Sequence, residues 1–125
     1  MRTLKGKVVS GVGNFSYWME RLEDYYYAKT GVRLFPGTLN LELESPYSLP
    51  REAARLEKEE YGGTVSVNIV PCRVFGREAF ILRTDSSEAG RGRHPKTIIE
   101  IACDVKLREL YGLSDGDLVE VEVSE

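Results

Sequence analysis

Two polar side chains in the segment TLNLELE, residues 38–44, have the types and spacing of metal ligands. Residues two apart in a β-strand point to the same side, so the Thr38 hydroxyl and the Asn40 amide would lie side by side while the leucines face a core. Mg²⁺ prefers oxygen ligands and takes only a few from a protein, leaving the rest to phosphates and water. The pair predicts either a Mg²⁺ site beside a phosphate or, more plainly, a turn followed by a solvent-exposed face.

A carboxylate interrupts the apolar run Ile98-Ile99-Glu100-Ile101-Ala102. An unpaired buried carboxylate would be costly, so Glu100 either faces solvent or has a partner. In a pocket it could accept a hydrogen bond from a substrate hydroxyl and act as a general base. Because a strand can also expose every second residue, both interpretations stay open.

Two further segments have features of anion sites. Gly11-Val12-Gly13 follows an expected strand and precedes an expected helix with Asn14 as its N-cap, which brings backbone N–H groups and a helix N-terminus together. A basic cluster lies in residues 84–96, a segment without periodicity: Arg91, Arg93, His94 and Lys96. The needs of a tight turn would equally explain the glycines, and a solvated loop would explain the basic cluster.

Aromatic residues are concentrated in one segment: Trp18, Tyr25, Tyr26 and Tyr27. Such rings could stack on a flat ligand, but their helical spacing favours packing in and around a core. They are assigned no ligand.

The elements that must position these residues are mainly strands. Alternating or continuous apolar segments predict strands at residues 4–12, 38–44, 64–70, 72–75, 79–83, 97–105 and 117–123, with a hairpin around Gly76-Arg77-Glu78. Helical spacing predicts a helix from Phe15 to a cap at Gly31, a charged helix over 51–61 and a short helix over 106–113. Turns separate the strands more often than crossover helices do, which favours a closed or partly closed barrel over a doubly wound parallel sheet.

Composition limits the classes of function. With 125 residues, 42% hydrophobic and 30% charged, the sequence predicts one globular domain over 1–125, with a monomer as a plausible state. A net charge of −3 argues against a general nucleic-acid partner. The absence of a long apolar run argues against a membrane segment and a signal peptide, so the expected location is cytoplasmic. Cys72 and Cys103 fit reduced, buried side chains, and His94 as the only histidine excludes histidine-rich metal sites.

Taken in order, three segments resemble the CTP-dependent riboflavin kinase family, best known from archaea: VVSGVGN, then LFPGTLNLEL, then TIIEIACDVKLRELYGLSDGDLVEVEV. The resemblance covers nearly the whole chain. The combination of PGTLN with the later EIACDVKLRE and DGD segments is specific, although each segment alone is modest support.

The resemblance implies a small six-stranded cradle-loop (RIFT-like) β-barrel with short helices. It implies an enzyme that transfers the γ-phosphate of CTP to the 5′-hydroxyl of riboflavin, giving FMN and CDP. Family-like roles fall on Thr38 and Asn40 as Mg²⁺ ligands and on Glu100 at the flavin side chain. The nucleotide site would include Gly11, Val12, Gly13 and Asn14 and the segment Val105, Lys106, Leu107 and Arg108.

Two positions depart from the family pattern. Asn14-Phe15-Ser16 stands where the family usually has Glu-Gly-Ala, which bears on the choice of phosphate donor. Gly92, at the flavin contact, stands where the family commonly has threonine, which bears on the acceptor. Two alternatives therefore stay open: a non-catalytic flavin or nucleotide sensor, and a related kinase with another acceptor or donor.

Overall fold

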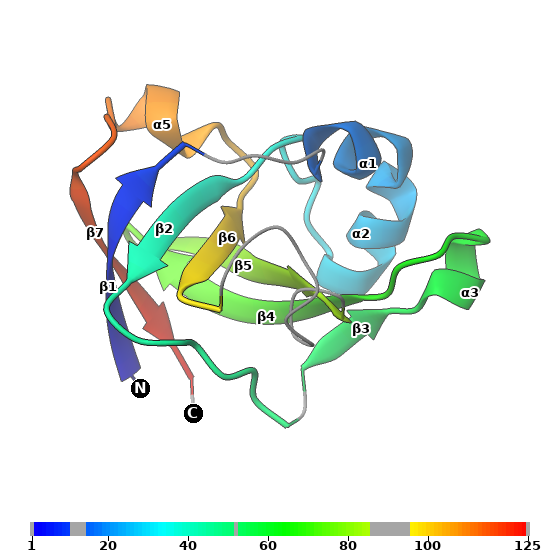
Figure 1. The fold of residues 1–125 in the computed structure, drawn as a ribbon. Coiled ribbons are helices and arrows are strands. Elements are labelled where there is room, and N and C mark those ends of the chain that lie inside the picture. The colour runs from blue at the N-terminus through cyan, green and yellow to red at the C-terminus, as the bar shows by residue number, and fades with distance from the viewer. Residues whose placement is uncertain (1, 11–14, 52, 86–95, 125) are drawn as a thin grey trace.

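Antiparallel strands close into a barrel in the computed structural model, which describes residues 2–10, 15–51, 53–85 and 96–124. Six strands follow one another around the barrel in the order β4-β5-β6-β2-β1-β7, and β7 pairs back onto β4. The described strands are β1 (Arg2–Val9), β2 (Leu39–Leu43), β3 (Ala54–Leu56), β4 (Val67–Val74), β5 (Arg77–Thr84), β6 (Ile98–Ala102) and β7 (Leu118–Val123). The six-stranded barrel expected from the sequence is confirmed (Figure 1).

Two strands pair with the same side of β4, each along one half of its length. β7 pairs with its second half, at residues 72–74, and β3 pairs with its first half, at residues 67–69. β3 therefore extends the sheet beyond the ring without opening it.

Four described helices accompany the barrel: α1 (Phe15–Arg21), α2 (Glu23–Thr30), α3 (Lys58–Tyr61) and α5 (Leu107–Leu110). Figure 1 shows α1 and α2 together on one side of the barrel, and α5 beside the ends of β1 and β7. Within the described part of the chain, no helix has the length and apolar character needed to cross a membrane.

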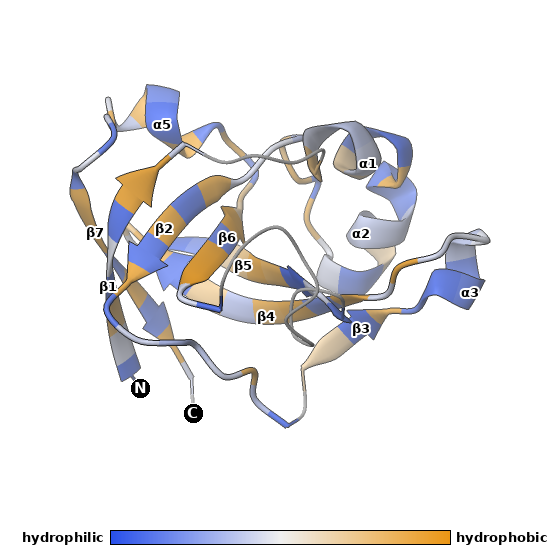
Figure 2. Cartoon of the chain, viewed as in Figure 1, coloured by the Kyte–Doolittle hydropathy of each residue, from blue (hydrophilic) through white to orange (hydrophobic). Residues whose placement is uncertain are grey.

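The buried apolar side chains form two clusters, one inside the barrel and one outside it. Figure 2 shows hydrophobic residues along the strands of the barrel. In β5, Ile81 belongs to the inner cluster, whereas Leu82 packs outside against Met19 and Tyr26 of the helices. Burial on both faces explains the continuous apolar run of β5. The same alternation in β6 turns Ile99 and Ile101 inward, so Glu100 lies on the outer, helix-covered side.

The hairpin between β4 and β5 is tighter than the sequence pattern indicated. Phe75 and Gly76 form its turn, with φ angles of 53° and 74°. Positive φ at both central residues is typical of a two-residue type I′ loop. The Phe75 ring stacks on Tyr111 with centroids 4.0 Å apart, which provides a favourable contact for a residue in a strained backbone region.

The helix expected from Phe15 is confirmed, but it is divided at Leu22 into α1 and α2. Its cap is also confirmed, because the Gly31 N–H donates to the Tyr27 carbonyl with Gly31 at φ 73°. Asn14, the expected N-cap, lies outside the described residues.

The charged helix expected over 51–61 is wrong in its first half. Residues 54–56 form β3, which pairs with β4, and only 58–61 are helical. Arg55 explains the difference, because its guanidinium binds the Asn68 and Asp85 side chains from the edge of the sheet. Tertiary pairing has overridden the local helical preference of a charged segment.

Candidate functional site

A polar cluster forms where β2 and β6 run side by side. Asn40 lies directly opposite Glu100 in the strand register, so their side chains share the outer face. Just before β2, the Thr38 hydroxyl donates a hydrogen bond of 3.0 Å to Glu100 Oε1. The structure therefore brings together the three residues that the sequence singled out for metal binding and acid–base chemistry.

Asn40 is more buried than its place in an alternating strand indicated. Its side chain is only 8% exposed, which excludes the solvent-face alternative. Among the residues that the structure describes, none forms a hydrogen bond with its Oδ1 atom. Buried polar atoms normally have partners, so an acceptor left without one indicates a place for a cation or a donor group.

The donor set fits Mg²⁺. The Thr38 hydroxyl, the Asn40 carbonyl oxygen and the Glu100 carboxylate are all hard oxygen groups. Within the described ranges, no group of three His, Cys, Asp or Glu side chains could hold a metal by itself. A cation here would consequently need oxygen ligands from a bound molecule as well.

A cavity of about 320 Å³, the Thr38 pocket, opens beside this cluster. Residues 35–39 line one side of it and residues 105–108 the other, so all four described residues of the expected nucleotide site face it. The 35–39 turn is held by a hydrogen bond of 2.8 Å from the Phe35 N–H to the Cys103 carbonyl. Gly37 has a φ of 142°, a backbone conformation that favours glycine.

The strand register also places the end of β1 next to the start of β2. Val9, the last residue of β1, lies opposite Asn40. The expected phosphate-binding turn, Gly11 to Asn14, begins two residues later but lies outside the described residues.

A second cavity, the aromatic groove, has a volume of about 480 Å³. Its lining includes Phe15, Trp18, Tyr26, Tyr61 and Thr84, contributed by α1, α2, α3 and β5. Burial raises the pKa of Tyr26, and the nearby Tyr61 and Glu100 raise it further. The phenol therefore stays neutral, and the hydrophobic rings give the groove the character of a site for a flat molecule.

The aromatic groove and the polar cluster lie on one face of the barrel. Leu82 of β5 is opposite Glu100 in the register, and Thr84 lies two residues further along the same strand. Residues two apart share a face, so Thr84, Glu100 and Asn40 all lie on the outer, helix-covered face of the sheet.

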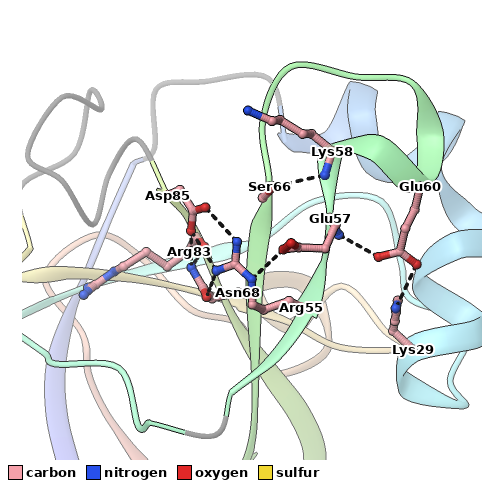
Figure 3. A network of polar contacts seen from close by, with 9 residues as sticks. All are labelled: Lys29, Arg55, Glu57, Lys58, Glu60, Ser66, Asn68, Arg83 and Asp85. Carbon is pink, nitrogen blue, oxygen red and sulfur yellow. Dashed lines mark hydrogen bonds and ion pairs between the residues drawn. The ribbon is translucent and has the colours of Figure 1, made fainter.

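A network of polar contacts joins β3, β4 and the end of β5 (Figure 3). Arg55 makes two hydrogen bonds to the Asp85 carboxylate, of 3.0 and 2.8 Å, and one of 2.8 Å to Asn68 Oδ1. The Asn68 amide in turn donates to Asp85 and to the Arg83 carbonyl. Every member is paired, so the network fixes the end of β5.

Arg83 holds the start of β6 in the same way. Its side chain is buried, and its guanidinium donates to the carbonyls of Tyr47, Lys96 and Ile98. Gly92, Arg91, Arg93 and His94 fall between these two fixed positions, outside the described residues. Of the expected basic cluster, the structure describes only Lys96.

Two groups of residues were not found by the sequence interpretation. The rings of the aromatic groove were assigned to packing, because convergence with Tyr61 is a long-range contact that helical spacing does not reveal. Asp115 was assigned no role, although its carboxylate binds Ser10 and Arg108. The DGD pattern was the one available signal for it.

The fold and the candidate site define a small closed antiparallel β-barrel with polar oxygen groups gathered beside the Thr38 pocket. The family model CTP-dep_RFKase, described as "Domain of unknown function DUF120", matches residues 8–123. Relatives named "Riboflavin kinase" are 35% identical in Methanocella arvoryzae, 39% in Archaeoglobus fulgidus and 36% in Ignicoccus hospitalis. The chain belongs to the CTP-dependent riboflavin kinase family.

The matches cover nearly all of this chain but only part of the relatives. They include 94%, 96% and 97% of the chain for the same three proteins. They include 55% of the Methanocella protein, 54% of the Archaeoglobus protein and 70% of the Ignicoccus protein. The chain therefore spans little more than half the length of two of these relatives.

Proposed function

We propose that this chain transfers the γ-phosphate of CTP to the 5′-hydroxyl of riboflavin, giving FMN and CDP with Mg²⁺. The observation that carries the proposal is the Thr38–Asn40–Glu100 cluster, in which Thr38 lines one cavity and Glu100 interacts with Tyr26 of the other. A phosphoryl transfer needs a donor site, an acceptor site and charge neutralisation where they meet. The names of the relatives and of the family support this choice of substrates.

The two cavities differ in chemistry, which suggests how the substrates divide between them. The Thr38 pocket carries the Lys106 and Arg108 side chains, and cations suit the phosphates of CTP. The aromatic groove is lined by rings and suits the flat isoalloxazine ring of riboflavin. A ribityl chain running from the groove along the shared face would bring its terminal hydroxyl toward Glu100.

Each residue of the cluster then has a defined task. The Thr38 hydroxyl and Asn40 Oδ1 would hold Mg²⁺, which when bound neutralises negative charge on the donor phosphates. Glu100 would orient the 5′-hydroxyl and accept its proton as the ribityl oxygen forms its bond to phosphorus. The bond between the γ-phosphorus and the β,γ-bridging oxygen breaks, and CDP leaves with that electron pair.

The first experiment incubates the purified chain with riboflavin, Mg²⁺ and CTP, ATP or GTP in separate reactions, and separates the products by chromatography. FMN is expected with CTP. An Asn40→Ala variant, with folding checked by circular dichroism, controls for a contaminating kinase. Absence of FMN with all three donors would overturn the proposal, and binding of riboflavin or CTP without turnover would then favour the sensor. FMN formed with ATP or GTP instead would correct the donor.

A further inference from the structure

The carboxylate of Asp115 joins the residue that follows β1 to α5, whose Arg108 lines the Thr38 pocket. Its Oδ2 atom accepts a hydrogen bond of 2.8 Å from the hydroxyl of Ser10, which follows β1. Its Oδ1 atom accepts one of 2.8 Å from Nη2 of Arg108 on α5. Ser10 and Asp115 are 105 residues apart in the sequence, so this contact is made by the fold.

The backbone around Asp115 is fixed without help from its side chain. The Gly116 N–H donates to the Val8 carbonyl and the Val8 N–H to the Asp117 carbonyl, both at 2.8 Å. The Ser114 N–H donates to the Asp117 carboxylate, also at 2.8 Å. The Asp115 carboxylate is therefore not needed to form the turn, and orienting other side chains is the task left to it.

Arg108 is well suited to act on a bound phosphate once it is oriented. It lines the Thr38 pocket, and its side chain is 34% exposed. No other described residue accepts a hydrogen bond from its guanidinium. A guanidinium has five N–H donors in a fixed plane, so a contact through Nη2 sets the plane and leaves donors for an anion.

Asp115 is charged under working conditions. The hydrogen bond from Ser10 and the charge and hydrogen bond of Arg108 hold the pKa of its carboxyl below the ordinary value. A permanent negative charge keeps the Arg108 contact in place across the neutral pH range.

We infer that Asp115 is a positioning residue of the nucleotide site. Its carboxylate orients Arg108 toward the donor phosphates and, through Ser10, also holds the end of β1. The inference rests on the proposed function, because it requires a nucleotide in the Thr38 pocket. It adds a residue that touches neither substrate. Its effect is preorganisation: a side chain already held in its binding orientation loses less entropy when the ligand arrives.

The test compares Asp115→Asn with wild type and with Asp24→Asn. Asp24 is a matched control, because it also binds an arginine at 2.8 Å, Arg33, but lines neither cavity. Calorimetric titration with CDP and steady-state kinetics with CTP and riboflavin are the measurements. The KM for CTP and the Kd for CDP should rise about fivefold in Asp115→Asn, the size expected for an exposed charge pair. The KM for riboflavin should not change, and Asp24→Asn should behave as wild type.

A double variant separates positioning from a general loss of structure. If Asp115 acts through Arg108, adding Asp115→Asn to Arg108→Ala should weaken CDP binding no further. Ser10→Ala removes the other contact to the same carboxylate, and we expect it to raise the Kd for CDP less than Asp115→Asn does. An unchanged or tighter Kd for CDP in Asp115→Asn would overturn the inference while FMN formation by the wild type upholds the proposed function. A wild type that binds no nucleotide overturns both.

Discussion

The Thr38 hydroxyl donates its hydrogen bond to Glu100 Oε1 at 3.0 Å, from the turn before β2 to the middle of β6. A hydroxyl has one hydrogen and two lone pairs, so donation to the carboxylate leaves both lone pairs of the Thr38 oxygen available. Thr38 lines the Thr38 pocket, and Asn40, two residues further along the chain, has an Oδ1 atom that accepts no hydrogen bond from any described residue. One hydrogen bond thereby orients the proposed cation ligand and the proposed base together.

Removing the Thr38 hydroxyl should impair metal use more than folding. In Thr38→Ala we expect kcat/KM to fall by about 10²-fold, the loss typical of a misplaced reacting group, and half-maximal activity to require more Mg²⁺. Thr38→Ser keeps the hydroxyl and should retain most activity. FMN formation over a series of Mg²⁺ concentrations measures both effects. Equal Mg²⁺ dependence in wild type and Thr38→Ala would remove Thr38 from the metal site.

Glu100→Gln tests whether the carboxylate takes a proton. Glutamine preserves the size of the side chain and an oxygen that accepts the Thr38 hydrogen bond, but it cannot act as a base. We expect kcat to fall by about 10²- to 10⁴-fold, the usual contribution of general acid–base catalysis, with the KM for riboflavin nearly unchanged. Steady-state kinetics measure both. A kcat close to the wild-type value would show that Glu100 only orients the hydroxyl.

The barrel could be predicted because its strands carry local signals. Alternation marks residues 117–123, and the apolar segments around Gly76 indicate the β4–β5 hairpin. The helix predicted for residues 51–57 was wrong because the charges of this segment lie at a sheet edge. There Arg55 pairs with Asp85, which is 30 residues away. A local pattern cannot reveal that partner.

The site could be predicted in part for a similar reason. Thr38 and Asn40 are adjacent by strand geometry alone, whereas the contact of Thr38 with Glu100 spans 62 residues and was not predicted. The family resemblance implied a role for each residue separately. One of the two interpretations of the strand pattern placed Asn40 on an exposed face. It is buried because α1 and α2 cover that side of the barrel, a packing that sequence periodicity does not specify.

The aromatic groove can be tested at its most exposed ring. Trp18 is 42% exposed, so Trp18→Ala should leave the fold intact while weakening riboflavin binding. Stacking of a flat ring on an aromatic side chain contributes about 1–3 kcal/mol, so its loss should raise the Kd for riboflavin about 5- to 150-fold. Quenching of riboflavin fluorescence measures the affinity, and CDP affinity should not change.

Tyr17 provides the matched control for this experiment. It is 52% exposed and contacts the Trp18 ring edge-on, but it does not line the groove. Tyr17→Ala should therefore bind riboflavin with nearly wild-type affinity. Equal losses in both variants, or none in Trp18→Ala, would contradict a flavin ring in the aromatic groove.

The Arg55–Asp85 pair should make the stability of the protein depend on pH in the acid range. The hydrogen bond from Arg55 is the main cause that lowers the pKa of Asp85, and Asn68 contributes as well. A carboxyl with a lowered folded-state pKa stabilises the protein above its unfolded pKa of about 3.9, and that stability is lost as the pH falls through the folded value. The side chains are 39% and 48% exposed, so we expect about 1 kcal/mol or less at pH 7.

Urea unfolding of wild type and Asp85→Asn from neutral pH down to about pH 2, below both pKa values, measures this contribution. The difference in the free energy of unfolding should be constant at neutral pH and should shrink as the pH falls below about 4, because protonation removes the same charge as the substitution does. In an Arg55→Met background, Asp85→Asn should cause a much smaller pH-dependent difference, because the main cause of the lowered pKa is gone. A difference that stays constant down to the lowest pH would mean that Asp85 stabilises the end of β5 through its shape and its contact with Asn68, and that its charge contributes nothing.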